Sequence, residues 1–317
     1  MNIMNAFLFP GQGSQIVGMG SEFYNNFNSV KKIFQEADAK LNLPLSKIIL
    51  NGPEDQLKLT KITQPAILAV SYSIFKILKE EFNFNFDSTK YFAGHSLGEY
   101  SALVCSGSLN FQDALYLLHE RGKSMQDAVP IGKGSMIAIL GANLSQINDI
   151  IQSEKKDNKG ICEVANDNSD GQVILSGDKE TVKKFQLLLK DQKIKSIPLK
   201  VSAPFHCSLM RPAADAMIGK IESINFETPS FSVVSNVTAK TVKDPVEIKK
   251  LLIDQIFSTV RWRESILNIF DQGVTNFIEI GPGKVLTGMV KRTLTKANCF
   301  SINSIADIKN TINELKK

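Results

Sequence analysis

Short apolar runs that end in glycine alternate along this chain with longer segments of helical periodicity. The run NAFLF at 5–9 leads into a glycine loop, and KYFAG at 90–94 leads into the helical pattern LGEYSALV at 97–104. Apolar residues recur every three or four positions at 65–82, and 277–292 repeats the order of strand, glycine turn and helix. This alternation predicts an α/β fold in which helices cover a parallel sheet.

The rhythm changes in the middle of the chain. Here the pattern predicts four strands and two helices in the order βαββαβ, with strands at 135–140, 161–167, 171–177 and 194–201 and helices at 143–153 and 179–192. That order is the ferredoxin-like arrangement. We therefore predict a core formed by residues 1–130 and 202–317, with a ferredoxin-like subdomain at 131–201 inserted into it.

Composition and charge limit the classes of function. The 37 basic and 32 acidic residues leave a net charge of +5, too weak and too scattered to indicate a nucleic-acid partner. No apolar run approaches the roughly 20 residues of a membrane span, and the N-terminus lacks the basic start of a signal peptide. We expect a cytoplasmic protein with no membrane partner.

The cysteines do not indicate a metal site or a disulfide framework. The chain has four of them, and their spacing is unpaired: Cys105, Cys162, Cys207 and Cys299. We therefore expect no metal and no redox cofactor. Cys207 follows His206 and raises the alternative of a thiol nucleophile, but adjacent residues of a strand point to opposite faces.

Ser96 lies in the sequence GHSLG, between an apolar strand pattern and a helical one. Gly-x-Ser-x-Gly suits a strand-to-helix turn so tight that only glycine tolerates the approach of the flanking backbone. A serine in that turn lies at a helix N-terminus, where free N–H groups favour negative charge. Ser96 is therefore a candidate nucleophile; the alternative is a residue that merely caps the helix.

A serine nucleophile needs a base, and the chain offers three histidines. His95 adjoins Ser96 in the turn, where neighbouring side chains rarely form a good nucleophile–base pair. His119 lies one residue off the apolar stripe of its helix. His206 follows an extended segment that leads back to the core, so it is the preferred base; the alternative is a structural histidine at a domain junction.

Arg121 borders the inward face of a predicted helix. The apolar stripe of that helix runs through Phe111, Leu115, Leu118, Gly122 and Met125. A buried guanidinium without a partner is costly. Arg121 therefore pairs either with an acidic residue elsewhere in the chain or with a substrate carboxylate, which arginine binds through two parallel hydrogen bonds.

The glycine-rich loop at 10–20 follows the first predicted strand. It matches neither the dinucleotide fingerprint nor the phosphate-binding P-loop. Its exposed amides could instead stabilise an oxyanion together with the N–H of the residue after the nucleophile. In this chain the pair would be Gln12 and Leu97.

Six segments together resemble the malonyl-CoA:acyl-carrier-protein transacylases of fatty-acid synthesis. In the order of that family they are FPGQGSQ, GHSLGEYSAL, RGKSMQDA, ANDNSDGQVILSG, VSAPFHCSLM and EIGPGKVLTGMVKR, and they span nearly the whole chain. The resemblance implies a hydrolase-like α/β core with an inserted ferredoxin-like subdomain. It also implies transfer of a malonyl group from malonyl-CoA to the phosphopantetheine thiol of acyl carrier protein.

The resemblance assigns roles to residues of this chain. Ser96 would be the acylated nucleophile, His206 its base, and Arg121 the ligand of the malonyl carboxylate. The family commonly orients its histidine through a main-chain carbonyl near a glutamine, which corresponds here to Gln255. The triplet PFH at 204–206 resembles the one in family members that select malonyl over a methyl-branched unit.

The resemblance also implies that the amides of Gln12 and Leu97 bind the oxyanion. We expect the enzyme to be a monomer that docks its carrier protein through basic surface near the cleft between core and insert. The candidate docking residues are Lys190, Lys193, Lys195, Lys291 and Arg292.

Two alternatives belong to other classes of protein. An α/β-hydrolase esterase or thioesterase shares Gly-x-Ser-x-Gly and needs an acid between serine and histidine. The acidic residues that could serve are Asp167, Asp170, Asp178 and Asp191. The inward Arg121 argues against this class. A catalytically dead carrier-docking module is the second alternative, and the presence of both Ser96 and His206 argues against it.

Overall fold

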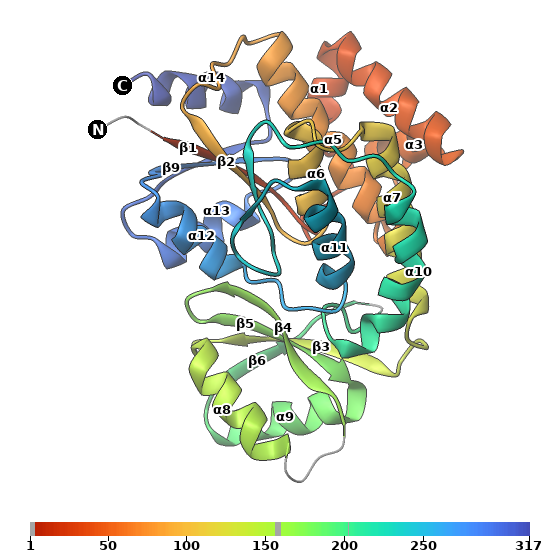
Figure 1. Cartoon of the computed structure of the whole chain (residues 1–317), viewed down its shortest axis with the longest axis vertical. Helices are drawn as coiled ribbons and strands as arrows, with labels where there is room; N and C mark the ends of the chain where they lie inside the picture. Colours follow the sequence, from red (N-terminus) through yellow and green to blue (C-terminus); the bar gives the residue numbers. More distant parts are fainter. Residues whose placement is uncertain (1–3, 156–159, 202) are drawn as a thin grey trace.

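The computed structural model describes residues 4–155, 160–201 and 203–317. Two separate sheets organise these residues, one of six strands and one of four (Figure 1). Across these described ranges, no helix combines the length and the apolar character that crossing a membrane requires.

The larger sheet has the strand order β10-β9-β1-β2-β7-β8. Its strands are β1 (Asn5–Phe9), β2 (Thr89–Gly94), β7 (Ser232–Val234), β8 (Thr241–Val242), β9 (Asn276–Ile280) and β10 (Asn298–Ile302). All neighbours pair in parallel except β7 and β8, which are antiparallel. The predicted parallel sheet is confirmed.

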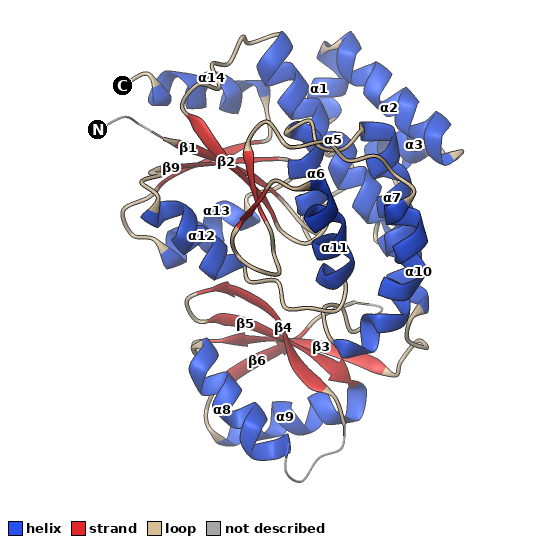
Figure 2. Ribbon diagram, in the orientation of Figure 1, coloured by secondary structure: helices blue, strands red, loops and turns tan. Residues whose placement is uncertain are grey.

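Helices cover both faces of this sheet (Figure 2). Those that belong to the core are α1 (Ser21–Asn26), α2 (Asn28–Leu41), α3 (Leu45–Asn51), α4 (Glu54–Leu57), α5 (Thr60–Glu80), α6 (Gly98–Cys105), α7 (Phe111–Asp127), α10 (Arg211–Glu222), α11 (Pro245–Gln255), α12 (Trp262–Asp271), α13 (Val285–Thr293) and α14 (Ile305–Leu315), with a 3-10 turn at Ser208–Met210. On β1, Phe7 and Phe9 join the cluster that includes α5, whereas Ala6 and Leu8 pack with α12 and α13. Successive side chains of β1 point to opposite faces of the sheet, so this one apolar strand contributes to the hydrophobic cluster on each face.

The smaller sheet has the order β4-β5-β3-β6 and is antiparallel throughout. Its elements are β3 (Gly134–Leu140), α8 (Leu144–Lys155), β4 (Cys162–Ser169), β5 (Gln172–Asp178), α9 (Lys179–Asp191) and β6 (Lys195–Pro198). This is the predicted βαββαβ order, although the last strand ends at Pro198 rather than 201. The fold class is therefore an α/β core with a ferredoxin-like insert, while the boundaries at 130/131 and 201/202 stay a prediction.

Each face of the smaller sheet packs against a different part of the molecule. Ile137 and Ile139 of β3 contact α8 and α9, which cover the outer face. Met136 and Ala138 point the other way and join the main core cluster. The sheet therefore lies between its own two helices and the core (Figure 1).

Strand β4 connects the two units directly. The N–H of Val260 donates to the carbonyl of Ala165 at 2.9 Å, and the N–H of Asp167 donates to the carbonyl of Val260 at 3.0 Å. Arg263 Nε lies 3.0 Å from Oδ1 of the buried Asp167. These contacts hold the insert against the loop between α11 and α12 and so define the cleft between the units.

The turn from β2 into α6 brings backbone segments unusually close together. A Cβ added at Gly94 would lie 1.9 Å from the carbonyl carbon and oxygen of Gly98, and one added at Gly98 would lie 2.2 Å from the carbonyl oxygen of Phe9. Both distances are shorter than any real Cβ contact. Glycine is required at both positions because of this approach.

Gly98→Ala should lower the free energy of unfolding by about 1–3 kcal/mol or more, because the new methyl group overlaps main-chain atoms that cannot move independently. The matched control is Gly219→Ala in α10, where an added Cβ meets nothing within 4 Å. That change should stabilise the helix by about 0.5–1 kcal/mol. Denaturant unfolding of both variants measures the difference, and equal effects would refute the steric explanation.

Candidate active site

Ser96 occupies a strained backbone conformation in the turn between β2 and α6. Its φ is 54°, in the left-handed region that non-glycine residues seldom adopt. Asn236, which follows β7, holds the turn from both sides. Its Oδ1 accepts from the N–H of Ser96 at 2.7 Å, and its Nδ2 donates to the carbonyl of Gly94 at 2.7 Å. The serine hydroxyl is thereby presented at the carboxyl end of the parallel sheet.

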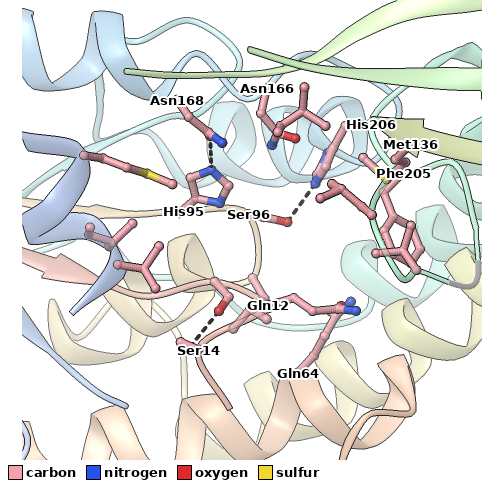
Figure 3. A pocket seen from close by; sticks show the side chains of 18 of the residues that line it. Gln12, Ser14, Gln64, His95, Ser96, Met136, Asn166, Asn168, Phe205 and His206 are labelled. Atoms are coloured by element: carbon pink, nitrogen blue, oxygen red, sulfur yellow. Dashed lines mark hydrogen bonds between the residues drawn. The ribbon is translucent and has the colours of Figure 1, made fainter. Parts of the chain in front are cut away.

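The hydroxyl of Ser96 meets His206. Ser96 Oγ lies 2.8 Å from His206 Nε2, a contact drawn as a dashed line in Figure 3. His206 Nδ1 lies 2.9 Å from the main-chain oxygen of Gln255. A carbonyl only accepts, so Nδ1 carries the proton and Nε2 is left to accept from the serine. The arrangement is a serine–histidine dyad oriented by a main-chain carbonyl.

His206 is held in its neutral form. Burial, and to a smaller extent the nearby positive charge of Arg121, together lower the pKa of its imidazole to about 3. The residue itself has a φ of 58°, and Glu163 fixes the chain just after it by accepting from the N–H and the hydroxyl of Ser208, each at 2.8 Å. At neutral pH the imidazole can therefore accept a proton.

Arg121 lies fully buried beside the nucleophile. Its Nη1 donates to Gln64 Oε1 at 2.7 Å, and its Nη2 donates to Gln255 Oε1 at 2.8 Å and to Ser96 Oγ at 3.2 Å. Its Nε has no partner among the residues that the structure describes. Within the same residues, no carboxylate lies within ion-pair distance of this guanidinium.

Gln255 joins the charged groups of the site to one another. Besides accepting from Arg121, its side chain donates from Nε2 to Glu99 Oε2 at 2.7 Å and to the carbonyl of Ser96 at 3.0 Å. Glu99 also accepts from the N–H of Asn236 at 3.1 Å. Gln255 thus fixes the nucleophile turn, the arginine and the histidine together.

Sequence reasoning missed three residues of this network: Gln64, Glu99 and Asn236. Glu99 did carry a signal, because it is the only charged residue in the otherwise apolar or small run LGEYSALV, of which all but Leu97 lies in α6. A charge in a helix that is buried all round needs a partner. Gln64 and Asn236 have no comparable local signal.

A cavity of about 310 Å³ opens beside Ser96 between the two units. The core supplies Gln12, Leu97 and Arg121 to its walls, and the insert supplies Met136 and Asn168. Figure 3 shows the Ser96 hydroxyl directed toward His206, with Gln12 and Gln64 on the opposite wall. Within the described part of the chain, neither the main-chain N–H of Gln12 nor that of Leu97 donates a hydrogen bond, so both amides are available to an oxyanion.

His95, His119 and the thiol of Cys207 have partners other than the Ser96 hydroxyl. His95 Nε2 lies 2.8 Å from Asn168 Oδ1, which joins the core to the insert, and His119 Nδ1 lies 3.0 Å from the carbonyl of Lys61. Cys207 is buried with its Sγ 3.1 Å from the carbonyl of Pro204, and burial raises the pKa of the thiol to about 11. A protonated, inward-facing thiol makes a poor nucleophile.

The aspartates that an esterase triad would use do not contact His206. Asp167 and Asp170 both face Arg263, and Asp178 accepts from the N–H of Ile161 at 2.7 Å. Asp191 lies at the exposed end of α9. In the part of the chain that is described, no group of three His, Cys, Asp or Glu residues has the arrangement of a metal site.

Comparisons with known proteins identify the family. The family model described as acyl transferase domain matches residues 6–315. The malonyl CoA-acyl carrier protein transacylase of Bacillus subtilis (strain 168) is 42% identical over 316 residues, which cover 98% of this chain and 97% of the relative.

Solved structures agree over the same length. The acyl-carrier-protein-S-malonyltransferase of Bartonella henselae is 37% identical with a TM-score of 0.95, covering 99% of this chain and 100% of its own. A malonyl-transacylase solved in complex with its holo type II PKS acyl-carrier protein is 39% identical with a TM-score of 0.94. The match covers 98% of this chain and 99% of the solved one. The chain therefore belongs to the acyl transferase family, among the malonyl CoA-acyl carrier protein transacylases.

Proposed function

We propose that this acyltransferase moves the malonyl group of malonyl-CoA to the phosphopantetheine thiol of acyl carrier protein in fatty-acid biosynthesis, through a malonyl ester on Ser96. The names of the relatives support the substrates. Within this chain the proposal rests above all on one observation: a fully buried arginine, without a carboxylate partner among the described residues, lies 3.2 Å from the Oγ of the serine that His206 contacts.

Arg121 favours a substrate whose acyl group carries a carboxylate. A guanidinium binds a carboxylate through two parallel hydrogen bonds, and a desolvated pair of this kind is strong. The glutamines that now accept from Arg121 are neutral, so among the described residues no carboxylate contacts its guanidinium directly. An acyl chain that brings its own negative charge to this position gains an interaction that acetyl cannot make.

In the first half-reaction Ser96 is the nucleophile. Neutral His206 takes the hydroxyl proton at Nε2 while Oγ attacks the thioester carbonyl. The amides of Gln12 and Leu97 receive the oxyanion, and its collapse expels the CoA sulfur, which takes the proton from His206. The carbonyl of Gln255 stabilises the imidazolium in between, through the Nδ1 hydrogen bond.

The second half-reaction reverses the first with a different thiol. The phosphopantetheine thiol gives its proton to His206 and attacks the malonyl ester, and Ser96 Oγ leaves with that proton. Each half-reaction conserves protons and changes no oxidation state, so we propose that neither a metal nor a redox cofactor takes part. The whole reaction is ping-pong.

We further propose that the enzyme works as a cytoplasmic monomer with neither nucleic-acid nor membrane partners. One chain supplies Ser96, His206, Arg121 and both oxyanion amides to a single cavity, which supports a monomeric site. The localisation rests on the sequence features described above.

The carrier protein is proposed to dock at the end of α13. Val285 and Met289 of this helix line the cavity, and the exposed Arg292 follows them by one further turn. The guanidinium of Arg292 reaches Gln172 Oε1 at 3.2 Å, across the boundary between core and insert. Lys190, by contrast, lies on α9, a helix that covers the outer face of the smaller sheet.

Of the other docking candidates, Lys193 follows α9 and Lys195 lies on the edge strand β6. Lys291 neighbours Arg292 and is exposed. Among these candidates, Lys291 and Arg292 belong to a helix that lines the cavity, whereas Lys190, Lys193 and Lys195 lie in segments that do not.

Ser96→Ala should accept no malonyl label from malonyl-CoA, because the only proposed nucleophile is removed. His206→Ala should form the ester about 10²-fold more slowly, the scale of positioned proton transfer. Intact-mass spectrometry after mixing with malonyl-CoA measures both. Cys207→Ala is the matched control and should be labelled like wild type; loss of label there would favour the thiol.

Arg121→Ala should lower kcat/KM for malonyl-CoA by about 10- to 100-fold, since a charged hydrogen bond contributes roughly 1.5–3 kcal/mol. The kcat/KM of Arg121→Ala for acetyl-CoA should equal or exceed that of the wild type, because acetyl has no carboxylate for the guanidinium of the wild type to bind. Arg121→Lys should rescue only partly, since it keeps the charge without the planar fork. An unchanged malonyl-to-acetyl ratio in Arg121→Ala, with only stability reduced, would make Arg121 structural.

Arg292→Gln should raise KM for the carrier protein by about 2- to 5-fold at low ionic strength, with a smaller effect as salt screens exposed charges. Lys190→Gln removes the same charge from the outer helix and should leave KM for the carrier unchanged. Steady-state kinetics at two salt concentrations distinguish the two sites. Equal effects of the two variants would mean that net charge, not a docking surface at α13, governs association.

A further inference from the structure

Glu99 is a buried carboxylate that the catalytic steps above do not use. It lies in the first turn of α6, three residues after Ser96, and is 2% exposed. Its Oε2 accepts from Gln255 Nε2 at 2.7 Å and from the N–H of Asn236 at 3.1 Å. A carboxylate removed from water to this degree needs a reason to be there.

One amide group links this carboxylate to the arginine. Gln255 donates from Nε2 to Glu99 and accepts at Oε1 from Arg121 Nη2 at 2.8 Å. The anion thus faces the amide's donor end and the cation faces its acceptor end. These two hydrogen bonds transmit the attraction between the two charges and fix the orientation of the Gln255 amide.

The charge balance of the site changes when the acyl group arrives. In the empty site one positive guanidinium and one negative carboxylate are buried together. A malonyl group on Ser96 adds a second carboxylate at the same guanidinium. Two buried anions would then share one cation, and like charges at close range cannot both stay ionised at low cost.

We propose that Glu99 is the counter-charge of Arg121 in the substrate-free enzyme, and that malonyl loading passes this role to the acyl carboxylate while Glu99 takes up one proton from solvent. This inference rests on the proposed function. Glu99 touches no reacting atom, so it is a positioning residue that acts through Gln255 and Arg121.

The proton balance is simple. Water or buffer supplies one proton to the Glu99 carboxylate, which becomes a neutral acid, and no covalent bond of the acyl transfer changes with it. Within the described residues both hydrogen bonds to this carboxylate end on Oε2. Protonation at Oε1 therefore leaves Gln255 and Asn236 in place.

The surroundings of Glu99 allow such a change near neutral pH. Burial raises the pKa of its carboxyl to about 7, against the lowering effects of the bonds from Asn236 and Gln255 and of the charge of Arg121 on α7. Tyr100 beside it on α6 also faces this pair, and burial raises the pKa of its phenol to about 12, so it stays neutral. The groups that face Glu99 from α11 and from the segment after β7 are the uncharged amides of Gln255 and Asn236.

The sign of the pH dependence follows from linkage. Below the empty-state pKa Glu99 is already protonated, so loading takes up no proton. Between the empty-state pKa and the higher loaded-state pKa, loading consumes up to one proton, and the equilibrium constant for malonylation falls by up to about 10-fold per pH unit. If Glu99 had only a structural role, its titration would add no pH dependence to the equilibrium constant for malonylation.

The experiment measures proton uptake when malonyl-CoA is mixed with the wild-type enzyme in weakly buffered indicator solution, at about pH 6 and about pH 8. Mass spectrometry of the same samples counts the malonyl-enzyme formed. Glu99→Gln is the matched variant, because an amide has the shape of the protonated acid and its oxygen can still accept from Gln255. Released CoA ionises equally in both proteins, so its contribution cancels in the difference.

At pH 8 the wild type should take up close to one proton more per malonyl-enzyme than Glu99→Gln, and at pH 6 the two should agree. Equal uptake by both proteins at pH 8 would overturn the inference. Should Glu99→Gln not fold, wild-type uptake alone decides: a difference of close to one proton between pH 8 and pH 6, after subtraction of the CoA titration, is required. Absence of malonyl-enzyme from the wild type would refute the proposed function itself, and this inference with it.

Discussion

The burial of one positive charge beside a serine hydroxyl is the constraint on which the site depends. A guanidinium fully removed from water must have its hydrogen bonds supplied by the protein, and Arg121 receives them from Gln64 on α5 and Gln255 on α11. The same charge lowers the pKa of His206 and balances the buried carboxylate of Glu99. The charge of Arg121 thus favours an acidic acyl group, adds to the larger effect of burial that keeps His206 neutral, and underlies the proposed exchange of one buried anion for another.

The geometry of the nucleophile is set by the backbone rather than by side chains. Parallel strands β1 and β2 end side by side, and the chain turns into α6 within a few residues because glycine at 94 and 98 permits main-chain contact. The turn holds Ser96 at a left-handed φ, which Asn236 stabilises. A rigid turn of this kind places Oγ without the entropy loss that a flexible loop would have to recover at each turnover.

The ferredoxin-like insert completes the site from the other side. The outer face of its sheet is covered by its own helices, so the inner face is free to form the second wall of the cavity, with Met136 and Asn168. Strand β4, joined to the segment around Val260, fixes the distance between the two walls. His206 lies just after the chain returns from the insert, and this connection brings it within 2.8 Å of Ser96, which is 110 residues earlier.

The sequence by itself determined the features that depend on neighbours along the chain: the parallel core, the βαββαβ insert, the glycine turn around Ser96, and the inward position of Arg121, all of which follow from periodicity and sterics over a few residues. Only the tertiary structure decided which buried groups meet. Asn236 is 140 residues from Ser96, and Gln255 is 134 residues from Arg121. No local pattern records such a pairing, because an amide shows its role only when folding brings a donor or an acceptor to it, and the free energy of that pairing belongs to the buried environment rather than to either segment.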